Sequence, residues 1–247
     1  MQIDFAAREV TVKLVYYGPA LSGKTTNLMA LHAAAGPEAR GRLVTLETRD
    51  DRTLFFDLLP LTFRSAEGDC SLRIKLFTVP GQPIHVSTRK LVLQGADGVA
   101  LIADSRLSET ENNATSFFDL RENLKQNGAD ISKMPLVIQF NKRDLPDIRS
   151  DKELAEIAAR GKEPVFPAIA RNGEGVVETL LGLLQLTWNT LDKSYDLTKR
   201  LGMKGDALLA SAASQLNAGQ PVDSLLAKSM GGSYSAIAGG AGGRVGT

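Results

Sequence analysis

The sequence predicts an α/β layer fold with a mostly parallel sheet, and three observations support this. Short apolar segments alternate with longer amphipathic segments through residues 1–193, which is the pattern of layered α/β proteins. Segments 98–104 and 136–141 are almost continuously apolar, as expected of strands buried on both faces of a parallel sheet. Segment 72–77 alternates apolar with polar residues, which indicates one exposed face and an antiparallel neighbour.

The other expected elements follow in chain order. Residues 10–17 form a strand, which leads through a glycine-containing loop into a helix over about 24–35. Short strands are expected at 43–46 and 61–64, and a turn at 67–69 precedes the alternating strand. Amphipathic patterns predict helices over 109–126, 151–160 and 175–191, and Trp188 in the last of them is expected to anchor the core.

The chain changes character after Lys193. Residues 194–230 carry leucines at four- and seven-residue steps, such as Leu197, Leu201 and Leu208, which predicts a helical extension. In 231–247, seven of 17 residues are glycine, so this tail is expected to be disordered. The sequence leaves open whether the extension docks on the first 193 residues, forms a separate helical pair or binds a partner.

Composition excludes several classes of protein. The 29 basic and 28 acidic residues nearly balance, which gives no electrostatic case for a nucleic-acid binder or a polybasic membrane binder. Cys70 is the only cysteine, so neither an intrachain disulfide nor a cysteine zinc site is expected. The sequence has no signal peptide pattern, no run of 18 apolar residues and no lipidation motif, so we expect a cytoplasmic protein without a membrane anchor.

A phosphate-binding loop follows the first strand. The pattern G-x-x-x-x-G-K-[ST] lies directly between a predicted strand and a predicted helix, which is the context such a loop requires. Backbone amides and the helix N-terminus would hold phosphate, Lys24 would neutralise the β- and γ-oxygens, and the Thr25 hydroxyl would bind Mg²⁺. The predicted phosphate-contacting residues are Gly18, Pro19, Ala20, Leu21, Ser22, Gly23, Lys24, Thr25 and Thr26.

The motif Asn141-Lys142-Arg143-Asp144, which follows the second buried strand, predicts which base the bound nucleotide carries. Asp144 would accept hydrogen bonds from guanine N1–H and the 2-amino group, whereas adenine would leave its carboxylate unpaired. Asn141 would tie this loop to the phosphate loop, and the stem of Lys142 would cover one face of the base. The sequence therefore predicts GTP and GDP as ligands and argues against an ATP-dependent kinase or transport ATPase.

At these residues the chain resembles the MglA-like branch of the Ras-like small GTPases, the bacterial polarity and gliding-motility switches. The resemblance covers roughly residues 1–193 and implies a P-loop NTPase with a Ras-like, mostly parallel sheet and helices on both faces, here followed by the C-terminal helical extension. Its most specific elements, besides the base motif and the following Leu145-Pro146, are Tyr16-Tyr17-Gly18-Pro19, Arg52-Thr53-Leu54-Phe55-Phe56-Asp57 and Thr78-Val79-Pro80-Gly81-Gln82.

The resemblance implies roles for the residues of two switch segments, 47–57 and 78–93. Thr53 matches the threonine that completes the Mg²⁺ shell in the triphosphate state, and Arg52 matches a built-in arginine finger. Gly81 matches the glycine whose amide senses the γ-phosphate, and Gln82 matches the glutamine that orients the attacking water. From the sequence alone Arg52 is more often a solvated charge and Gln82 a turn residue, and the resemblance reverses both interpretations. The pair Phe55-Phe56 is either core or a switch surface.

Three positions depart from the usual pattern. Thr78 stands where most GTPases carry aspartate, and the MglA-like branch has the same threonine. Its hydroxyl would hold a magnesium-bound water without supplying a charge. The loop Ile169-Ala170-Arg171 replaces Ser-Ala-Lys, and the Ala170 amide is expected to donate to guanine O6. Ala20 stands where the family usually has glycine, and its methyl group is expected to slow hydrolysis.

The predicted function is a GTP-binding switch that hydrolyses GTP slowly without an activator and cycles between an effector-binding GTP state and an inactive GDP state. The resemblance implies a roadblock-type, MglB-like GTPase-activating partner, effectors of cell polarity or motility, and recruitment to a cell pole. The alternative is a GTP-occupied scaffold with negligible turnover that acts through its C-terminal extension.

Overall fold

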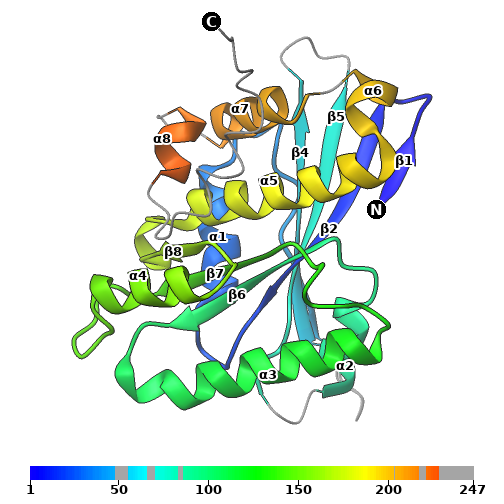
Figure 1. Cartoon of the computed structure of the whole chain (residues 1–247). Coiled ribbons are helices and arrows are strands. Elements are labelled where there is room, and N and C mark those ends of the chain that lie inside the picture. The colour runs from blue at the N-terminus through cyan, green and yellow to red at the C-terminus, as the bar shows by residue number, and fades with distance from the viewer. Residues whose placement is uncertain (48–54, 66–69, 83–85, 203, 217–220, 228–247) are drawn as a thin grey trace, which may run out of the picture.

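The structure is a computed structural model, which describes residues 1–47, 55–65, 70–82, 86–202, 204–216 and 221–227. Its centre is an eight-stranded sheet in which seven strands follow the order β3-β4-β5-β2-β6-β7-β8, and β1 pairs with β2 (Figure 1). The strands are β1 (Gln2–Asp4), β2 (Glu9–Tyr17), β3 (Val44–Glu47), β4 (Phe55–Arg64), β5 (Ser71–Thr78), β6 (Gly98–Asp104), β7 (Leu136–Asn141) and β8 (Val165–Pro167).

The sheet is mostly parallel, as the sequence predicts. Strand β2 pairs in parallel with β5 and β6, and β6–β7 and β7–β8 are also parallel. The pairs β3–β4 and β4–β5 are antiparallel, which confirms the antiparallel neighbour expected for segment 72–77. The predicted turn at 67–69 lies outside the described residues.

Helices cover both faces of the sheet (Figure 1). Apolar side chains of α2, α3 and α4 pack on one face, while α1, α5, α7 and α8 pack on the other. The helices are α1 (Lys24–Ala34), α2 (Val86–Leu93), α3 (Thr110–Gln126), α4 (Asp151–Arg160), α5 (Val176–Tyr195), α6 (Leu197–Leu201), α7 (Gly205–Gln215) and α8 (Val222–Leu226), with 3-10 turns η2 (Leu107–Glu109) and η3 (Ala170–Asn172). None of the described helices is long and apolar enough to cross a bilayer.

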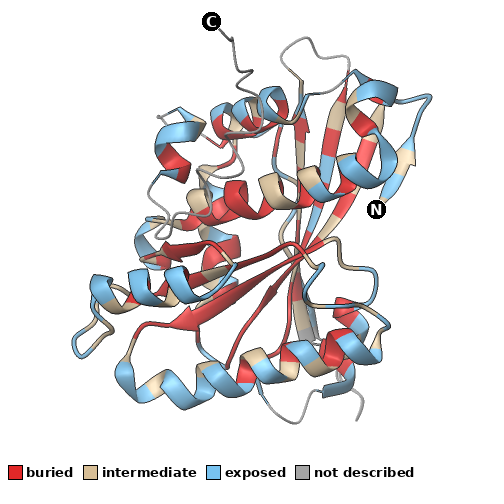
Figure 2. Ribbon diagram, in the orientation of Figure 1, coloured by how far each residue is buried: buried red, intermediate tan, exposed pale blue. Residues whose placement is uncertain are grey.

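The alternation of side chains along β2 explains the two-layered core. Leu14 and Tyr16 point to the α1–α5 face, and Val15 and Tyr17 point to the α2–α3 face, because successive residues of a strand face opposite sides. All four side chains are fully buried, as is most of the central sheet (Figure 2). Trp188 is buried in the α1–α5 layer, so the sequence-based expectation of a core anchor is confirmed.

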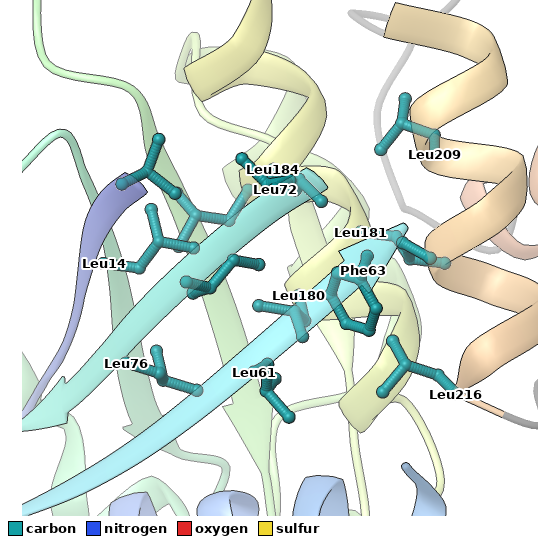
Figure 3. Close-up of a cluster of buried hydrophobic side chains, with 14 of the residues drawn as sticks. Leu14, Leu61, Phe63, Leu72, Leu76, Leu180, Leu181, Leu184, Leu209 and Leu216 are labelled. Carbon is teal, nitrogen blue, oxygen red and sulfur yellow. The ribbon is translucent and has the colours of Figure 1, made fainter. Parts of the chain in front are cut away.

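The extension docks on the sheet, which is the first of the three arrangements left open by the sequence. Leu209 and Leu216 from the extension lie in the same core as Phe63 of β4 and Leu181 of α5 (Figure 3). The N-terminus of α7 fits against the Trp188 ring, where a Cβ at Gly205 would come within 2.7 Å of Cδ1. The predicted tail over 231–247 lies outside the described residues.

Some elements differ from the prediction. Strand β4 begins at Phe55, whereas the sequence predicted a strand only from residue 61. Asp57 and Pro60 interrupt the apolar pattern of its first half, so that half was not recognised. The residue Pro60 is tolerated because β3 pairs with β4 only as far as Leu58, so its missing amide falls beyond that ladder. Strands β1 and β8 and helix α2 were not predicted; α2 has eight residues and includes the weak helix formers valine, serine and threonine.

Candidate functional site

The phosphate loop joins β2 to α1 at the carboxyl end of the parallel strands, where ligands of open α/β sheets bind. Two glycines permit its path. A Cβ at Gly18 would lie 2.2 Å from the carbonyl oxygen of Ile102, and Gly23 has φ +100°, a left-handed conformation. Leu21 is exposed, Ser22 is buried, and Thr26 is half-buried on the first turn of α1. The loop is thus a backbone cradle without room for larger side chains at its two glycines.

Lys24 is a buried cation within this cradle. Its Nζ donates to the carbonyl oxygens of Gly18 at 2.9 Å and Pro19 at 2.6 Å. Burial, with a smaller contribution from the Arg89 charge and opposed by Asp57, lowers the pKa of Lys24 to about 7. Within the described part of the chain no carboxylate lies within ion-pair distance of Nζ, so the ammonium group is suited to a bound anion.

A cluster of oxygen atoms lies beside the loop. Thr25 Oγ1 donates to Asp57 Oδ2 at 2.7 Å, Thr78 Oγ1 donates to the same oxygen at 2.9 Å, and Thr45 Oγ1 donates to Oδ1 at 2.8 Å. Asp57 is buried, and its amide donates back to Thr78 Oγ1 at 2.9 Å. Hydroxyl and carboxylate oxygens are the ligands that Mg²⁺ prefers, so this donor set fits the metal.

Asp57 was not among the predicted site residues. The sequence marked it only as the end of a family motif, and no local pattern connects it with Thr25, which is 32 positions away. The strand pairing reveals the connection, because β4 is antiparallel to β5, so β4 begins beside Thr78, where β5 ends. The Thr78 hydroxyl therefore lies against a carboxylate of the neighbouring strand.

The base motif contacts the phosphate loop through Asn141. Its Nδ2 donates to the carbonyl oxygen of Ser22 at 2.8 Å, and its Oδ1 accepts from the amide of Ala170 at 2.9 Å. A Cβ at Gly23 would lie 2.1 Å from Asn141 Nδ2, so the contact requires glycine there. The Ala170 amide, expected to donate to guanine, has the Asn141 side chain as its partner in this structure.

Three ion pairs flank the same edge of the sheet. Lys142 Nζ lies 2.6 Å from Asp104 Oδ2, and Arg106 contacts the same carboxylate at 2.7 Å. Burial would raise the pKa of Asp104, but hydrogen bonds from Arg106 and Lys142 outweigh it and lower that pKa. Arg171 lies 3.2 Å from Asp144. Lys142 and Asp144 therefore each have an oppositely charged partner.

The second predicted switch begins directly against the phosphate loop. A Cβ at Gly81 would lie 2.3 Å from the amide nitrogen of Ala20, so Gly81 packs flat on that backbone. Gln82 follows and is exposed. A cavity of about 410 Å³ opens here between the phosphate loop, α2 and α3; Gly18, Pro19, Ala20, Gly81 and Arg89 help to line it.

Two predicted residues, Arg52 and Thr53, lie outside the described residues, and the structure does not place them. Of the aromatic pair, Phe56 is half-buried with its ring centroid 5.8 Å from that of Phe77. The other predicted site residues from the phosphate loop, the second switch and the base motif lie at the carboxyl ends of the parallel strands.

Comparison with known proteins identifies the family. No protein-family model matches the chain. The sequence is 43% identical over 191 residues to the mutual gliding-motility protein MglA of Myxococcus xanthus (strain DK1622), and the match covers 77% of this chain and 97% of that relative. Since nearly all of the relative is matched, about a quarter of this chain has no counterpart in it. The chain therefore belongs to the MglA-like family of small GTPases.

Proposed function

We propose that the chain is a regulatory switch that binds Mg·GTP and hydrolyses it to GDP and phosphate. The observation that carries the proposal is the pair of hydrogen bonds made by Asn141 to Ser22 and Ala170. They join the phosphate loop, the base motif and the loop after β8 into one site. A site that couples phosphate binding to guanine recognition in this way suits a guanine nucleotide.

Phosphate and metal would be held by residues of α1 and the adjoining strands. Lys24 would neutralise the β- and γ-phosphate oxygens, and the phosphate would restore the proton affinity that burial removes from its amine. Thr25 would bind Mg²⁺, with Thr53 as a second ligand in the triphosphate state and Asp57 and Thr78 holding its waters. When bound, Mg²⁺ would neutralise charge on the β- and γ-phosphates.

Hydrolysis would use the two switch segments. Gln82 would orient the attacking water, and Arg52 would stabilise charge on the transferred phosphoryl group. The amide of Gly81 would sense the γ-phosphate, and loss of the contacts of Thr53 and Gly81 after hydrolysis would release both switches. A GTP-bound conformation able to bind effectors would thus differ from a GDP-bound one.

Base selectivity is tested at Asp144. An Asp144→Asn variant should lose GTP affinity by about 10- to 100-fold, because a buried guanine donor pair loses its acceptor, and should gain affinity for xanthosine nucleotides. Asp147→Asn, three residues further on and exposed, is the matched control and should leave both affinities unchanged. Unchanged GTP affinity in the Asp144→Asn variant would refute the assignment of the base site.

The biological setting is proposed from the relative, whose name places it in gliding motility. We infer that this chain acts in cell polarity or motility, with polar recruitment, effectors that recognise the GTP state and a roadblock-type activating partner. The activator would position the switches rather than supply its own arginine. Phosphate release with and without such a partner tests this: a stimulated rate is expected, and no stimulation by a cognate partner contradicts it.

A GTP-occupied scaffold with negligible turnover is the second candidate, and the contact of Gly81 with Ala20 favours it. The methyl group of Ala20 adjoins the place where Gln82 must approach the γ-phosphate, and a displacement of about 1 Å costs on the order of 10²-fold in rate. Ala20→Gly should therefore accelerate single-turnover hydrolysis. If it does not, with or without an activator, Ala20 does not set the rate.

A further inference from the structure

Arg89 on α2 is a buried arginine that contacts the second switch. Its side chain is 6% exposed. Its Nη1 donates to the carbonyl oxygen of Gln82 at 2.6 Å, and its Nε lies 2.8 Å from Asp119 Oδ2 on α3. The buried charge of Arg89 is compensated by the Asp119 carboxylate, although Nε is not in hydrogen-bond geometry with it. The guanidinium is thus held between a carboxylate on α3 and the backbone of Gln82.

The carboxylate that holds Arg89 is itself fixed. Asp119 accepts a hydrogen bond from the Tyr17 hydroxyl, and Asn123 Nδ2 donates to that hydroxyl at 3.0 Å. Tyr17 is the last residue of β2, directly before the phosphate loop. Burial, with the neighbouring Asp119, raises the pKa of Tyr17 so that it remains a donor. Arg89 is therefore anchored to the strand from which the phosphate loop begins.

The backbone around Gln82 is contacted from two directions, at the preceding Gly81 and at the Gln82 carbonyl. On one side Gly81 packs on the backbone of Ala20, and on the other Arg89 holds the Gln82 carbonyl. The Gln82 side chain is left exposed beside the phosphate loop. Its direction depends on the orientation of the backbone from which it projects.

We propose that Arg89 is a positioning residue for GTP hydrolysis. By fixing the Gln82 carbonyl against the frame formed by Asp119 and Tyr17, it holds the Gln82 side chain where the attacking water must be oriented. The role rests on the proposed function of Gln82 and adds to it a residue that acts through the backbone of Gln82.

The geometry requires arginine. One planar group places Nη1 on the Gln82 carbonyl and Nε in the ion pair with Asp119, whereas a lysine has a single ammonium group on a flexible stem. Arg89→Lys preserves the charge beside Asp119 but cannot hold both Asp119 and the Gln82 carbonyl. It is therefore the informative substitution.

The first experiment compares Arg89→Lys with Lys90→Met, which removes a charge from the next residue of the same helix. Arg89→Lys should slow single-turnover GTP hydrolysis by about 10- to 100-fold, the range that a displacement of about 1 Å produces, with GDP affinity within about twofold of the original protein. Lys90→Met should change neither. An unchanged hydrolysis rate, or an equal loss of rate and affinity, overturns the proposal.

Asp119→Asn provides a second variant should Arg89→Lys fold poorly. It keeps the shape of the side chain and the partner for Tyr17 but removes the charge that orients Arg89. A smaller slowing of hydrolysis with preserved GDP affinity is expected. Full activity in the Asp119→Asn variant would contradict an anchoring role for this carboxylate.

The carbonyl ¹³C chemical shift of Gln82 separates this proposal from the proposed function. In the nucleotide-free protein, Arg89→Lys should move this resonance upfield, because the carbonyl loses a charge-assisted hydrogen bond, and Lys90→Met should not. An unchanged resonance overturns the positioning role even if GTP is hydrolysed. A full-length protein that binds no guanine nucleotide overturns the proposed function, while the carbonyl resonance still tests the contact made by Arg89.

Discussion

Thr25 at the start of α1 donates its hydroxyl proton to the carboxylate of Asp57 on β4 at 2.7 Å. Thr45 and Thr78 donate to the same carboxylate, so hydroxyls from α1, β3 and β5 converge on one buried acidic side chain. The resemblance to the MglA-like branch implies that Thr78 stands where most GTPases have aspartate. The negative charge missing from that position is thus present on the next strand.

Replacing Asp57 should weaken the dependence of nucleotide binding on Mg²⁺. A unit charge about 4 Å from a cation is worth about 1–4 kcal/mol between bulk water and a protein surface, and each 1.4 kcal/mol is tenfold in affinity. In Asp57→Asn, the ratio of GDP affinities with Mg²⁺ and with a chelator should fall by about tenfold. A fluorescent GDP titration under the two conditions measures this ratio.

Thr45→Val is the matched control, because it removes a hydroxyl from the same cluster and leaves the charge. Its Mg²⁺ dependence should remain close to that of the original protein. A larger ratio in Asp57→Asn would mean that the carboxylate competes with the metal for Thr25 rather than supporting it.

Lys24 should give the nucleotide-free protein a stability that rises with pH. Its pKa is about 7 in the folded protein against 10.5 for the ordinary amine, so between these values the unfolded chain binds a proton that the folded one does not. The free energy of unfolding contributed by Lys24 then increases with pH, by up to about 1.4 kcal/mol per unit. Below about pH 7 both states are protonated and this contribution is constant.

The measurement is denaturant unfolding of the nucleotide-free protein between pH 7 and pH 10, compared with Lys24→Met. The difference between the two proteins isolates Lys24 from other titrating groups and should grow in favour of the original chain as the pH rises. Saturating GDP should flatten the trend, because phosphate holds the proton on the amine. Parallel pH curves for the two proteins would show that Lys24 is not perturbed.

Gly23 should be intolerant of a side chain for a reason that differs from ordinary strain. A Cβ there would meet Asn141 Nδ2 at 2.1 Å, whereas Gly128 has φ +75° and nothing within 4 Å of its added Cβ. Both alanine variants should lose about 1–2 kcal/mol of stability from the left-handed backbone. Only Gly23→Ala should also lose nucleotide affinity, by about 10- to 100-fold through the broken Asn141 contact.

Stability and GDP affinity of the two glycine variants are to be measured on the same preparations. Equal losses in both quantities would show that backbone strain alone explains the requirement for Gly23. A selective loss of affinity in Gly23→Ala identifies the Asn141 contact as part of the nucleotide site.

The predictable parts of the site are those formed by short motifs of neighbouring residues. The phosphate loop needs its glycines and Lys24 at fixed spacing, and segments 98–104 and 136–141 signal burial by composition alone. Asp57 and Arg89 act through residues on other elements, and neither lies in a motif that states its partner. Their roles follow from strand pairing and helix packing, which local patterns do not encode.

The extension illustrates the same limit. Its leucine spacing predicted helices, but the pattern is equally consistent with docking, a separate pair or a partner surface. What decides the matter is the apolar face of β4, where Phe63 needs cover. Phe63 lies within the strand expected at 61–64, but the sequence pattern does not show which segment of the chain covers that face of the strand.

Polar contacts between α7 and β4 should contribute measurably to stability. The Ser211 hydroxyl and Gln215 Nε2 both donate to the carbonyl oxygen of Arg64, the second at 3.0 Å, and the Arg64 amide donates to Gln215 Oε1 at 3.4 Å. The Gln215 carbonyl also accepts from the amide of Gly36 at 2.9 Å. Gln215 thus joins the extension to the end of β4 and to the turn after α1.

The double variant Ser211→Ala/Gln215→Ala removes the side-chain bonds and leaves the leucine packing, which a chain shortened to residue 193 would destroy. Its free energy of unfolding should fall by about 1–3 kcal/mol, because the Arg64 carbonyl loses its side-chain donors. Ser214→Ala, on the exposed side of α7, should change stability by less than about 0.5 kcal/mol. Urea denaturation measures both, and an equal effect of the two variants would mean that the extension is held on β4 by its apolar contacts alone.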